Sequence, residues 1–210
     1  MIGVAGPSCS GKSEVSRRLA RILRAPTLIL DHYYRDLKDI SFAERVKTNF
    51  DAPGSIDSEL VIDHIRALNE NCVIEQPTYD FALHTRAPQT EMIVPAPFIL
   101  VEGLFALYWP EVRDALNLRV YIDATHDICL TRRIFRDVRE RGRTEESVRH
   151  QYAETVEPMC EKYVAPGREF ANLVLSGVAP VKQSVYTILI YIAGHLGDPS
   201  LSNLAPAVED

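Results

Sequence analysis

The sequence has few of the features that mark secreted, membrane or zinc-binding proteins. Its four cysteines are scattered and form no C-x-x-C pair, so neither a disulfide framework nor a zinc site is indicated. No hydrophobic run is long enough to span a membrane, and no signal-type segment precedes the first strand-like run. The formal net charge is −6, which disfavours nucleic acid as a partner. We therefore expect a cytoplasmic protein with reduced thiols and with neither a membrane nor a nucleic-acid partner.

What the sequence does contain is an alternation of short hydrophobic runs with amphipathic stretches. Hydrophobic residues make up 46% of the 210-residue chain, enough for the core of one domain. We expect strands at Ile2–Ala5, Thr27–Leu30, Phe98–Val101, Leu118–Ile122 and Leu173–Leu175, and helices at Lys12–Leu23, Ser58–Leu68, Thr125–Arg141, Glu145–Tyr163 and Val181–His195. This order predicts an α/β fold with a central parallel sheet and helices on both faces. One domain is expected over residues 1–195, with a disordered tail over residues 196–210.

Two segments between the helices carry patterns of their own. Residues 73–94 contain strand-like runs broken by Pro77, which predicts an antiparallel β-ribbon inserted beside the sheet. Ser41 and Glu44 have the spacing of a capping box, which predicts the start of a short helix. The ribbon would provide a wall for an acceptor site.

The run G-P-S-C-S-G-K-S matches the P-loop pattern G-x-x-x-x-G-K-[ST]. It comprises Gly6, Pro7, Ser8, Cys9, Ser10, Gly11, Lys12 and Ser13. The run follows a predicted strand and opens a predicted helix, so its backbone amides and the helix N-terminus would bind phosphate oxygens. Lys12 would reach the β- and γ-phosphates, and the Ser13 hydroxyl would bind Mg²⁺. The sequence thus predicts a nucleoside triphosphate site.

Two carboxylates follow predicted strands at the same edge of the sheet. Asp31 follows Thr27–Leu30, and Glu102 follows Phe98–Val101. A carboxylate beside a phosphate loop can hold Mg²⁺ or accept a proton from an attacking hydroxyl. The alternative for each is a helix cap.

A cluster of arginines occupies the helix expected to end near residue 141 and the turn that follows it. Its members are Arg132, Arg133, Arg136, Arg139, Arg141 and Arg143. Such a cluster over residues 133–146 would suit a lid that places guanidinium groups on a transferring phosphoryl group and excludes water. The alternative is a solvated helix face stabilised by ion pairs with Asp137 and Glu140. It stays open for Arg132 and Arg139 in particular.

Aromatic and hydrogen-bonding side chains form a third group. They lie in the runs Asn49-Phe50-Asp51 and Tyr79-Asp80-Phe81-x-x-His84-x-Arg86. Aromatic faces stack on a nucleobase, and one carboxylate can accept hydrogen bonds from two vicinal hydroxyls of a ribose. Alone, such residues more often belong to a core than to a binding site, but beside a P-loop they favour a nucleoside acceptor.

Taken together, these motifs resemble the uridine kinases (uridine–cytidine kinases) of the P-loop kinase superfamily. The resemblance extends from Ile2 to about Leu175. It rests on the P-loop, Asp31-His32-Tyr33-Tyr34-Arg35-Asp36-Leu37, Asn49-Phe50-Asp51-x-Pro53, Pro77-x-Tyr79-Asp80-Phe81-x-x-His84-x-Arg86, Glu102-Gly103, Arg136-Asp137-x-x-x-Arg141-Gly142-Arg143, Gln151-Tyr152 and the segment from Tyr163-x-x-Pro166 to Phe170-Ala171.

The resemblance implies a role for each matching residue. Asp31 would take the proton of the ribose 5′-hydroxyl, and Asp31, Glu102 and Ser13 would serve the Mg²⁺ site. Asp51 and Arg133 would contact the ribose hydroxyls, and Arg136 and Arg141 would act with Lys12 in phosphoryl transfer. Phe50 and Phe81 would flank the pyrimidine, while Tyr79, His84, Arg143 and Gln151 would complete its pocket.

The implied reaction is phosphorylation of uridine or cytidine to the 5′-monophosphate, in pyrimidine salvage, with ATP or GTP as donor and Mg²⁺ as cofactor. A homo-oligomer, a tetramer or a dimer, is also implied. Pro7 and Cys9 depart from the family's loop, and residues 176–180 depart from its adenine-side segment, which leaves the donor base open. Two alternatives also stay open: another kinase of this fold, similar to phosphoribulokinase or pantothenate kinase, and a non-catalytic nucleotide-binding regulatory module.

Overall fold

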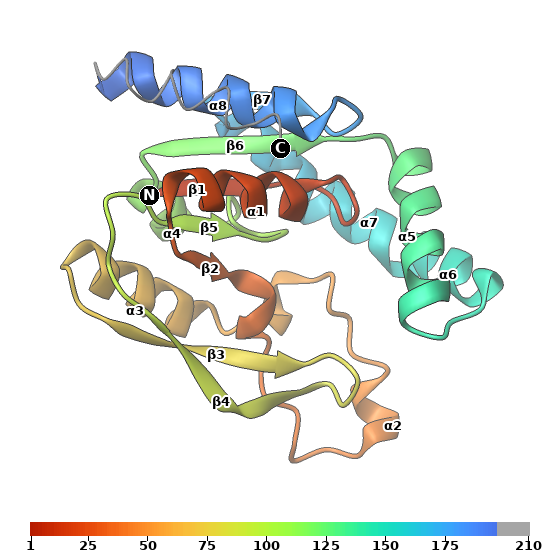
Figure 1. Ribbon diagram of the computed structural model, residues 1–210. Helices are drawn as coiled ribbons and strands as arrows, with labels where there is room; N and C mark the ends of the chain where they lie inside the picture. The colour runs from red at the N-terminus through yellow and green to blue at the C-terminus, as the bar shows by residue number, and fades with distance from the viewer. Residues whose placement is uncertain (197–210) are drawn as a thin grey trace.

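The computed structural model describes residues 1–196, and a five-stranded parallel sheet lies at its centre (Figure 1). The strand order is β2-β5-β1-β6-β7. The bounds are β1 (Ile2–Ala5), β2 (Thr27–Ile29), β5 (Leu100–Glu102), β6 (Leu118–Asp123) and β7 (Leu173–Ser176). The predicted parallel sheet is confirmed, whereas the predicted tail, apart from residue 196, lies outside the described residues.

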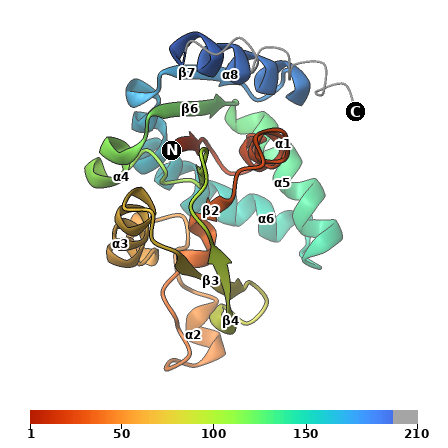
Figure 2. The same cartoon turned by 60° about the vertical axis from the view of Figure 1, so that its left-hand side comes forward.

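Helices cover both faces of this sheet, as the sequence predicts (Figures 1 and 2). On one face α1 (Lys12–Leu23) and α8 (Val181–Leu196) pack against each other and share a hydrophobic core with β1 and β6. On the other face α3 (Ser58–Asn69) and α4 (Pro110–Ala115) pack together over a second core. Within β1, Val4 belongs to the first core and Ala5 to the second, because successive strand residues point to opposite faces. Among the described residues, no helix is both long enough and apolar enough to cross a lipid bilayer.

The predicted ribbon is a separate antiparallel pair, β3 (Ile74–Asp80) and β4 (Thr85–Ile93). Its register shifts between Pro77 and Tyr79, since proline cannot donate to the ladder. The ribbon is held against β2 by side chains. Gln76 is buried, and its Oε1 accepts a hydrogen bond from the Ile29 amide at 2.9 Å. Arg86 donates to the Tyr34 carbonyl at 3.0 Å and pairs with Asp57 at 2.9 Å.

Short helices connect β2 to α3 along one side of the ribbon. They are η1 (Leu30–Tyr33), α2 (Phe42–Arg45) and η2 (Pro53–Ser55). The capping box predicted for Ser41 and Glu44 is present at the start of α2. Leu30 begins η1 and does not end β2, so Asp31 lies on a 3₁₀ turn, and Glu102 is the last residue of β5 rather than the residue after it. Both carboxylates still lie at the carboxyl edge of the sheet.

The segment after β6 is helical but less regular than the sequence predicts. It contains α5 (His126–Glu140), α6 (Glu145–Gln151), η3 (Tyr152–Val156), α7 (Glu157–Met159), η4 (Cys160–Val164) and η5 (Ala165–Phe170). The single helix predicted over Glu145–Tyr163 is wrong in its details, because η3 and η4 are π-helical turns. Pro158 lies between them and has no amide to donate, so the helix widens around it.

Gly177 directly follows β7 and packs against the backbone of the phosphate loop. A Cβ atom at this position would lie 2.3 Å from the Ser10 carbonyl oxygen, whereas one at Gly194 in α8 would meet nothing within 4 Å. We expect Gly177→Ala to lower the free energy of unfolding by about 1–3 kcal/mol through overpacking. Gly194→Ala should raise it by about 0.5–1 kcal/mol, because alanine is the better helix former. Urea unfolding followed by circular dichroism measures both. Equal stability of the two variants would contradict the crowding at Gly177.

Candidate active site

The phosphate loop connects β1 to α1, the strand–loop–helix order that its sequence predicts. Gly6, Cys9 and Gly11 adopt positive φ angles of 149°, 65° and 105°. A positive φ is costly for a residue with a side chain, so Cys9 lies in a tightly constrained turn. Pro7 is accommodated, because its carbonyl accepts hydrogen bonds from the Ser10 amide at 3.1 Å and from Lys12 Nζ at 3.4 Å.

Parallel pairing brings the two candidate carboxylates to this loop. Val4 of β1 pairs with Glu102 of β5, and Ile29 of β2 pairs with the same residue. Glu102 is buried, its Oε1 accepts a hydrogen bond from Ser13 Oγ at 3.1 Å, and Lys12 Nζ lies 4.0 Å from the same oxygen. Burial raises the pKa of Glu102; Lys12 and Ser13 lower it, and the charge of Asp31 raises it. The protonation of Glu102 therefore depends on Lys12 and Ser13 of the loop and on Asp31 beside it.

Oxygen atoms from Ser13, Glu102 and Asp31 fit a magnesium ion. Carboxylate and hydroxyl oxygens are the ligands that this hard cation prefers. Within residues 1–196 no group of three or more His, Cys, Asp or Glu side chains could hold a metal by itself. Such a site would therefore need phosphate oxygens and water, as Mg²⁺ sites in kinases do.

A cavity of about 1900 Å³ opens in front of the loop. The predicted residues that line it are Ser8, Cys9, Gly11, Lys12, Ser13, Asp31, Phe50, Asp51, Tyr79, Phe81, His84, Arg133, Arg136, Arg141, Arg143 and Gln151. Gly6, Pro7, Ser10 and Glu102 are buried. The structure therefore brings the predicted phosphate, acceptor and arginine groups to one cavity.

Aromatic rings form one wall of this cavity. Phe50 stacks on His84 with ring centroids 5.0 Å apart and planes 18° apart. Phe81 packs edge-on against Tyr79 at 5.4 Å. Tyr34, to which the sequence analysis assigns no role, joins the two pairs, since its ring lies 5.0 Å from Phe50 and 5.3 Å from Tyr79. Rings that pack against one another in this way form a rigid aromatic wall, against which a planar ligand can stack or pack edge-on.

Asp51 also lines the cavity, close enough to Asp31 and Lys12 for their charges to affect its carboxyl. Burial raises the pKa of its carboxyl, Arg133 lowers it, and Asp31 raises it. Arg133 donates to Ser8 Oγ of the phosphate loop at 3.0 Å and to Gln151 Oε1 at 3.3 Å. Asp51 and Arg133 thus lie together between the phosphate loop and the aromatic wall.

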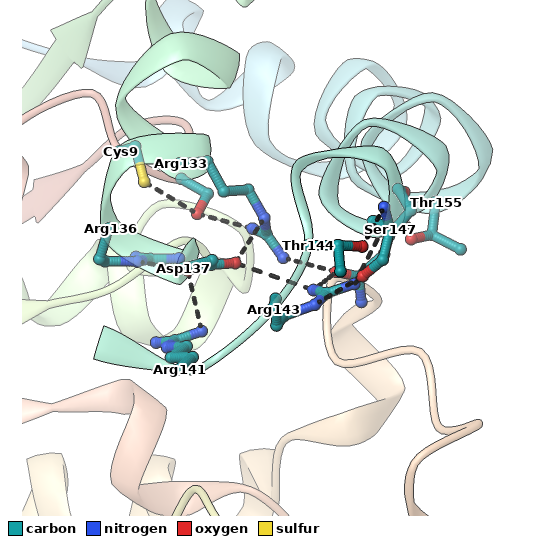
Figure 3. Close-up of polar contacts among 11 residues, drawn as sticks. Cys9, Arg133, Arg136, Asp137, Arg141, Arg143, Thr144, Ser147 and Thr155 are labelled. Carbon is teal, nitrogen blue, oxygen red and sulfur yellow. Dashed lines mark hydrogen bonds and ion pairs between the residues drawn. The ribbon is translucent and has the colours of Figure 1, made fainter. Parts of the chain in front are cut away.

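The arginines of α5 and of the turn after it do not simply form a solvated helix face with Asp137. Asp137 is fully buried, and four arginines surround its carboxylate (Figure 3). The sequence analysis missed this arrangement, although one acid at helical spacing among several arginines is a detectable signal.

The two arginines for which the alternative stayed open differ from each other. Arg132 is exposed, but its guanidinium donates to the carbonyl oxygens of Cys9, Ser10 and Gly177 at 3.4, 3.2 and 2.9 Å. Arg139 is exposed and stacks over the Phe135 ring at 4.0 Å. Arg132 therefore braces the phosphate loop, whereas Arg139 belongs to the outer face of the helix.

Residues 1–184 match the model of the phosphoribulokinase/uridine kinase family. The uridine kinase of Deinococcus deserti is 42% identical over 178 residues, which cover 83% of this chain and 86% of that protein. The uridine kinase of Escherichia coli K12 is 40% identical over 182 residues, with coverage of 83% and 85%.

Solved structures with the same fold are more distant in sequence. A putative fructose transport system kinase from Silicibacter superposes with a TM-score of 0.65 at 18% identity and covers 82% of this chain and 87% of its own. Phosphoribulokinase from Rhodobacter spheroides gives 0.62 at 16% identity, with coverage of 84% and 69%. These structures support the P-loop kinase fold alone.

The brace formed by Arg132 predicts a selective defect in nucleotide binding. Arg132→Ala removes the donor from two carbonyls of the phosphate loop and from the Gly177 carbonyl. It should weaken ATP binding about tenfold, or about 1.4 kcal/mol, which is near the net contribution of one hydrogen bond to a charged group. Arg139→Ala, on the same helix, is the matched control and should bind ATP normally. Isothermal titration calorimetry with a non-hydrolysable ATP analogue measures both. Equal affinities would show that the brace does not shape the loop.

Proposed function

Because the chain belongs to the phosphoribulokinase/uridine kinase family, we propose that it phosphorylates the 5′-hydroxyl of a pyrimidine ribonucleoside, uridine or cytidine, in pyrimidine salvage. The chain is a kinase that uses ATP and transfers phosphate to a hydroxyl group. The observation that supports the acceptor is the cavity, in which Asp31, Asp51 and the aromatic wall lie beside the phosphate loop.

Phosphoryl transfer requires positioning and charge neutralisation more than covalent chemistry by the protein. In this proposal the loop amides and Lys12 hold the β- and γ-phosphates, and Arg136 and Arg141 neutralise charge on the transferring group. Mg²⁺, when bound, would draw charge from the phosphate oxygens beside Ser13 and Glu102. Asp31 would accept the proton of the attacking hydroxyl, since it lies on the turn that ends β2, beside the loop.

The acceptor would enter between the aromatic wall and Asp51. Asp51 would accept hydrogen bonds from the two ribose hydroxyls. Burial raises the pKa of its carboxyl, and the charge of Arg133 opposes that rise. Phe50 and Phe81 would contact the faces of the pyrimidine. Tyr79, His84, Arg143 and Gln151 would bind its edge.

Several finer features belong to the same proposal. Gly177, Ala179 and Val181 line the cavity near the phosphate loop and have no side-chain group that could hydrogen-bond a purine, so GTP is an alternative donor to ATP. Residues 133–146 would act as a lid over the triphosphate. A homo-oligomer, tetramer or dimer, and a cytoplasmic location complete the proposal.

An ADP-release assay across acceptors tests the substrate class. With ATP and Mg²⁺, uridine and cytidine should turn over, whereas ribulose 5-phosphate, pantothenate and adenosine should not. The kcat/KM for 2′-deoxyuridine should be lower by roughly one to two decades, because a missing hydroxyl leaves the half-buried Asp51 short of a partner, at about 1–3 kcal/mol. Failure of both pyrimidine ribonucleosides would overturn the proposal. ATP binding without turnover of any acceptor would favour the regulatory module.

The role of Asp31 gives a second test. Asp31→Asn should lower kcat by at least about a hundredfold, because the amide cannot accept the hydroxyl proton and general-base catalysis contributes roughly 10²–10⁴. ATP affinity, measured by calorimetry, should change little. Asp39→Asn, an exposed acid in the segment between η1 and α2, is the control. Near-normal turnover of Asp31→Asn would remove Asp31 from this role.

A further inference from the structure

Asp137 is a fully buried acid in the part of α5 that faces the cavity, and its side chain is shared by four arginines (Figure 3). Arg136 Nε donates to Oδ1 at 2.8 Å, and Arg141 Nη1 lies 3.6 Å from the same oxygen. On the other oxygen, Arg133 Nε lies 3.6 Å and Arg143 Nη1 3.8 Å from Oδ2.

The four arginines form two pairs, one near each oxygen of Asp137. Arg133 reaches the phosphate loop through Ser8, and both Arg133 and Arg143 donate to Gln151. In the proposed function this pair faces the nucleoside, while Arg136 and Arg141 face the transferring phosphoryl group. One oxygen of Asp137 thus serves the donor-side pair, and the other serves the acceptor-side pair.

The backbone of Asp137 contributes to the same arrangement. Its carbonyl accepts the amides of Arg141 and Arg143, each at 3.2 Å, in the turn that contains Gly142 at φ 63°. The side chain and the carbonyl of one residue therefore fix both the end of α5 and the direction of the turn that follows it.

Electrostatics explains why this carboxylate is needed. Four guanidinium groups around one site repel one another when partly shielded from water. Burial lowers the pKa of Arg141, the charge of Arg136 lowers it further, and Asp137 raises it. A single central anion holds them at defined positions and still leaves an excess of positive charge toward the cavity.

We propose that Asp137 is a positioning residue that holds the donor-side and acceptor-side arginines in one network and so aligns the two substrates. The proposal rests on the proposed function for its substrates, but the network itself is a property of the described residues. It assigns Asp137 neither to proton transfer nor to metal binding.

The test compares Asp137→Asn with Asp127→Asn, an exposed acid on the same helix. Asp137→Asn keeps the shape and the backbone bonds but removes the charge. Its kcat should fall about a hundredfold, because displacement of catalytic groups by about 1 Å has effects of this size, and its KM for uridine should rise. Asp127→Asn should stay within about twofold of wild type. In an Arg136→Gln background, Asp137→Asn should lower kcat much less, since the two changes act through the same group.

The affinity for inorganic tripolyphosphate separates positioning from simple charge, and it does not depend on turnover. Loss of one negative charge alone would strengthen binding of this polyanion, whereas loss of alignment should weaken it severalfold in calorimetry. Stronger binding together with normal kcat would overturn the proposal. So would a kcat that excess Mg²⁺ restores, because that result indicates a metal ligand.

Failure of the proposed function and misfolding of the variant can each be told apart from failure of the positioning role. If wild type turns over neither uridine nor cytidine, the proposed function fails, while the tripolyphosphate measurement still decides the role of Asp137. If Asp137→Asn does not fold by circular dichroism, Asp137→Glu replaces it: this variant keeps the charge but shifts the carboxylate by one methylene. A wild-type kcat for Asp137→Glu would overturn the positioning role.

Discussion

The carboxyl edge of the parallel sheet is the constraint on which the rest of this structure depends. Because β5 pairs with β1 on one side and β2 on the other, the ends of three strands must lie next to one another. The phosphate loop, Glu102 and the turn that carries Asp31 continue from those ends. Backbone hydrogen bonds thus bring together groups that are distant in sequence, and they do so independently of the side chains that later perform the chemistry.

The fold and the candidate site could be predicted from the sequence to the extent that they depend on local pattern. Hydrophobic runs identified the central strands, the G-K-S signature located the loop, and the bounds of α1 are those predicted. Leu30 was assigned to β2 because it continues a hydrophobic run, yet the chain turns there into η1. The π-helical turns around Pro158 escaped prediction, because periodicity does not distinguish them from an ordinary helix.

The features that escaped the sequence analysis depend on contacts between distant segments or on burial. Arg132 and Arg139 lie on the same helix and have the same chemistry, but only Arg132 reaches the carbonyls of the phosphate loop. Asp137 has the spacing of a local ion-pair partner, but its burial depends on how the surrounding segments pack, which spacing along the chain does not reveal. Tyr34 joins aromatic rings from two separate segments.

The ribbon forms its own two-stranded sheet and meets the central sheet through side chains. Gln76 accepts a hydrogen bond from the Ile29 amide of β2, and Ile74, Tyr79 and Ile93 share a hydrophobic core with β2 and β5. Its residues can therefore change without altering the pairing of the strands that carry the phosphate loop and the carboxylates. Evolution of acceptor choice is consequently separable from evolution of phosphate transfer in this architecture. Exchange of the ribbon between relatives is a route by which one catalytic edge could acquire new substrates.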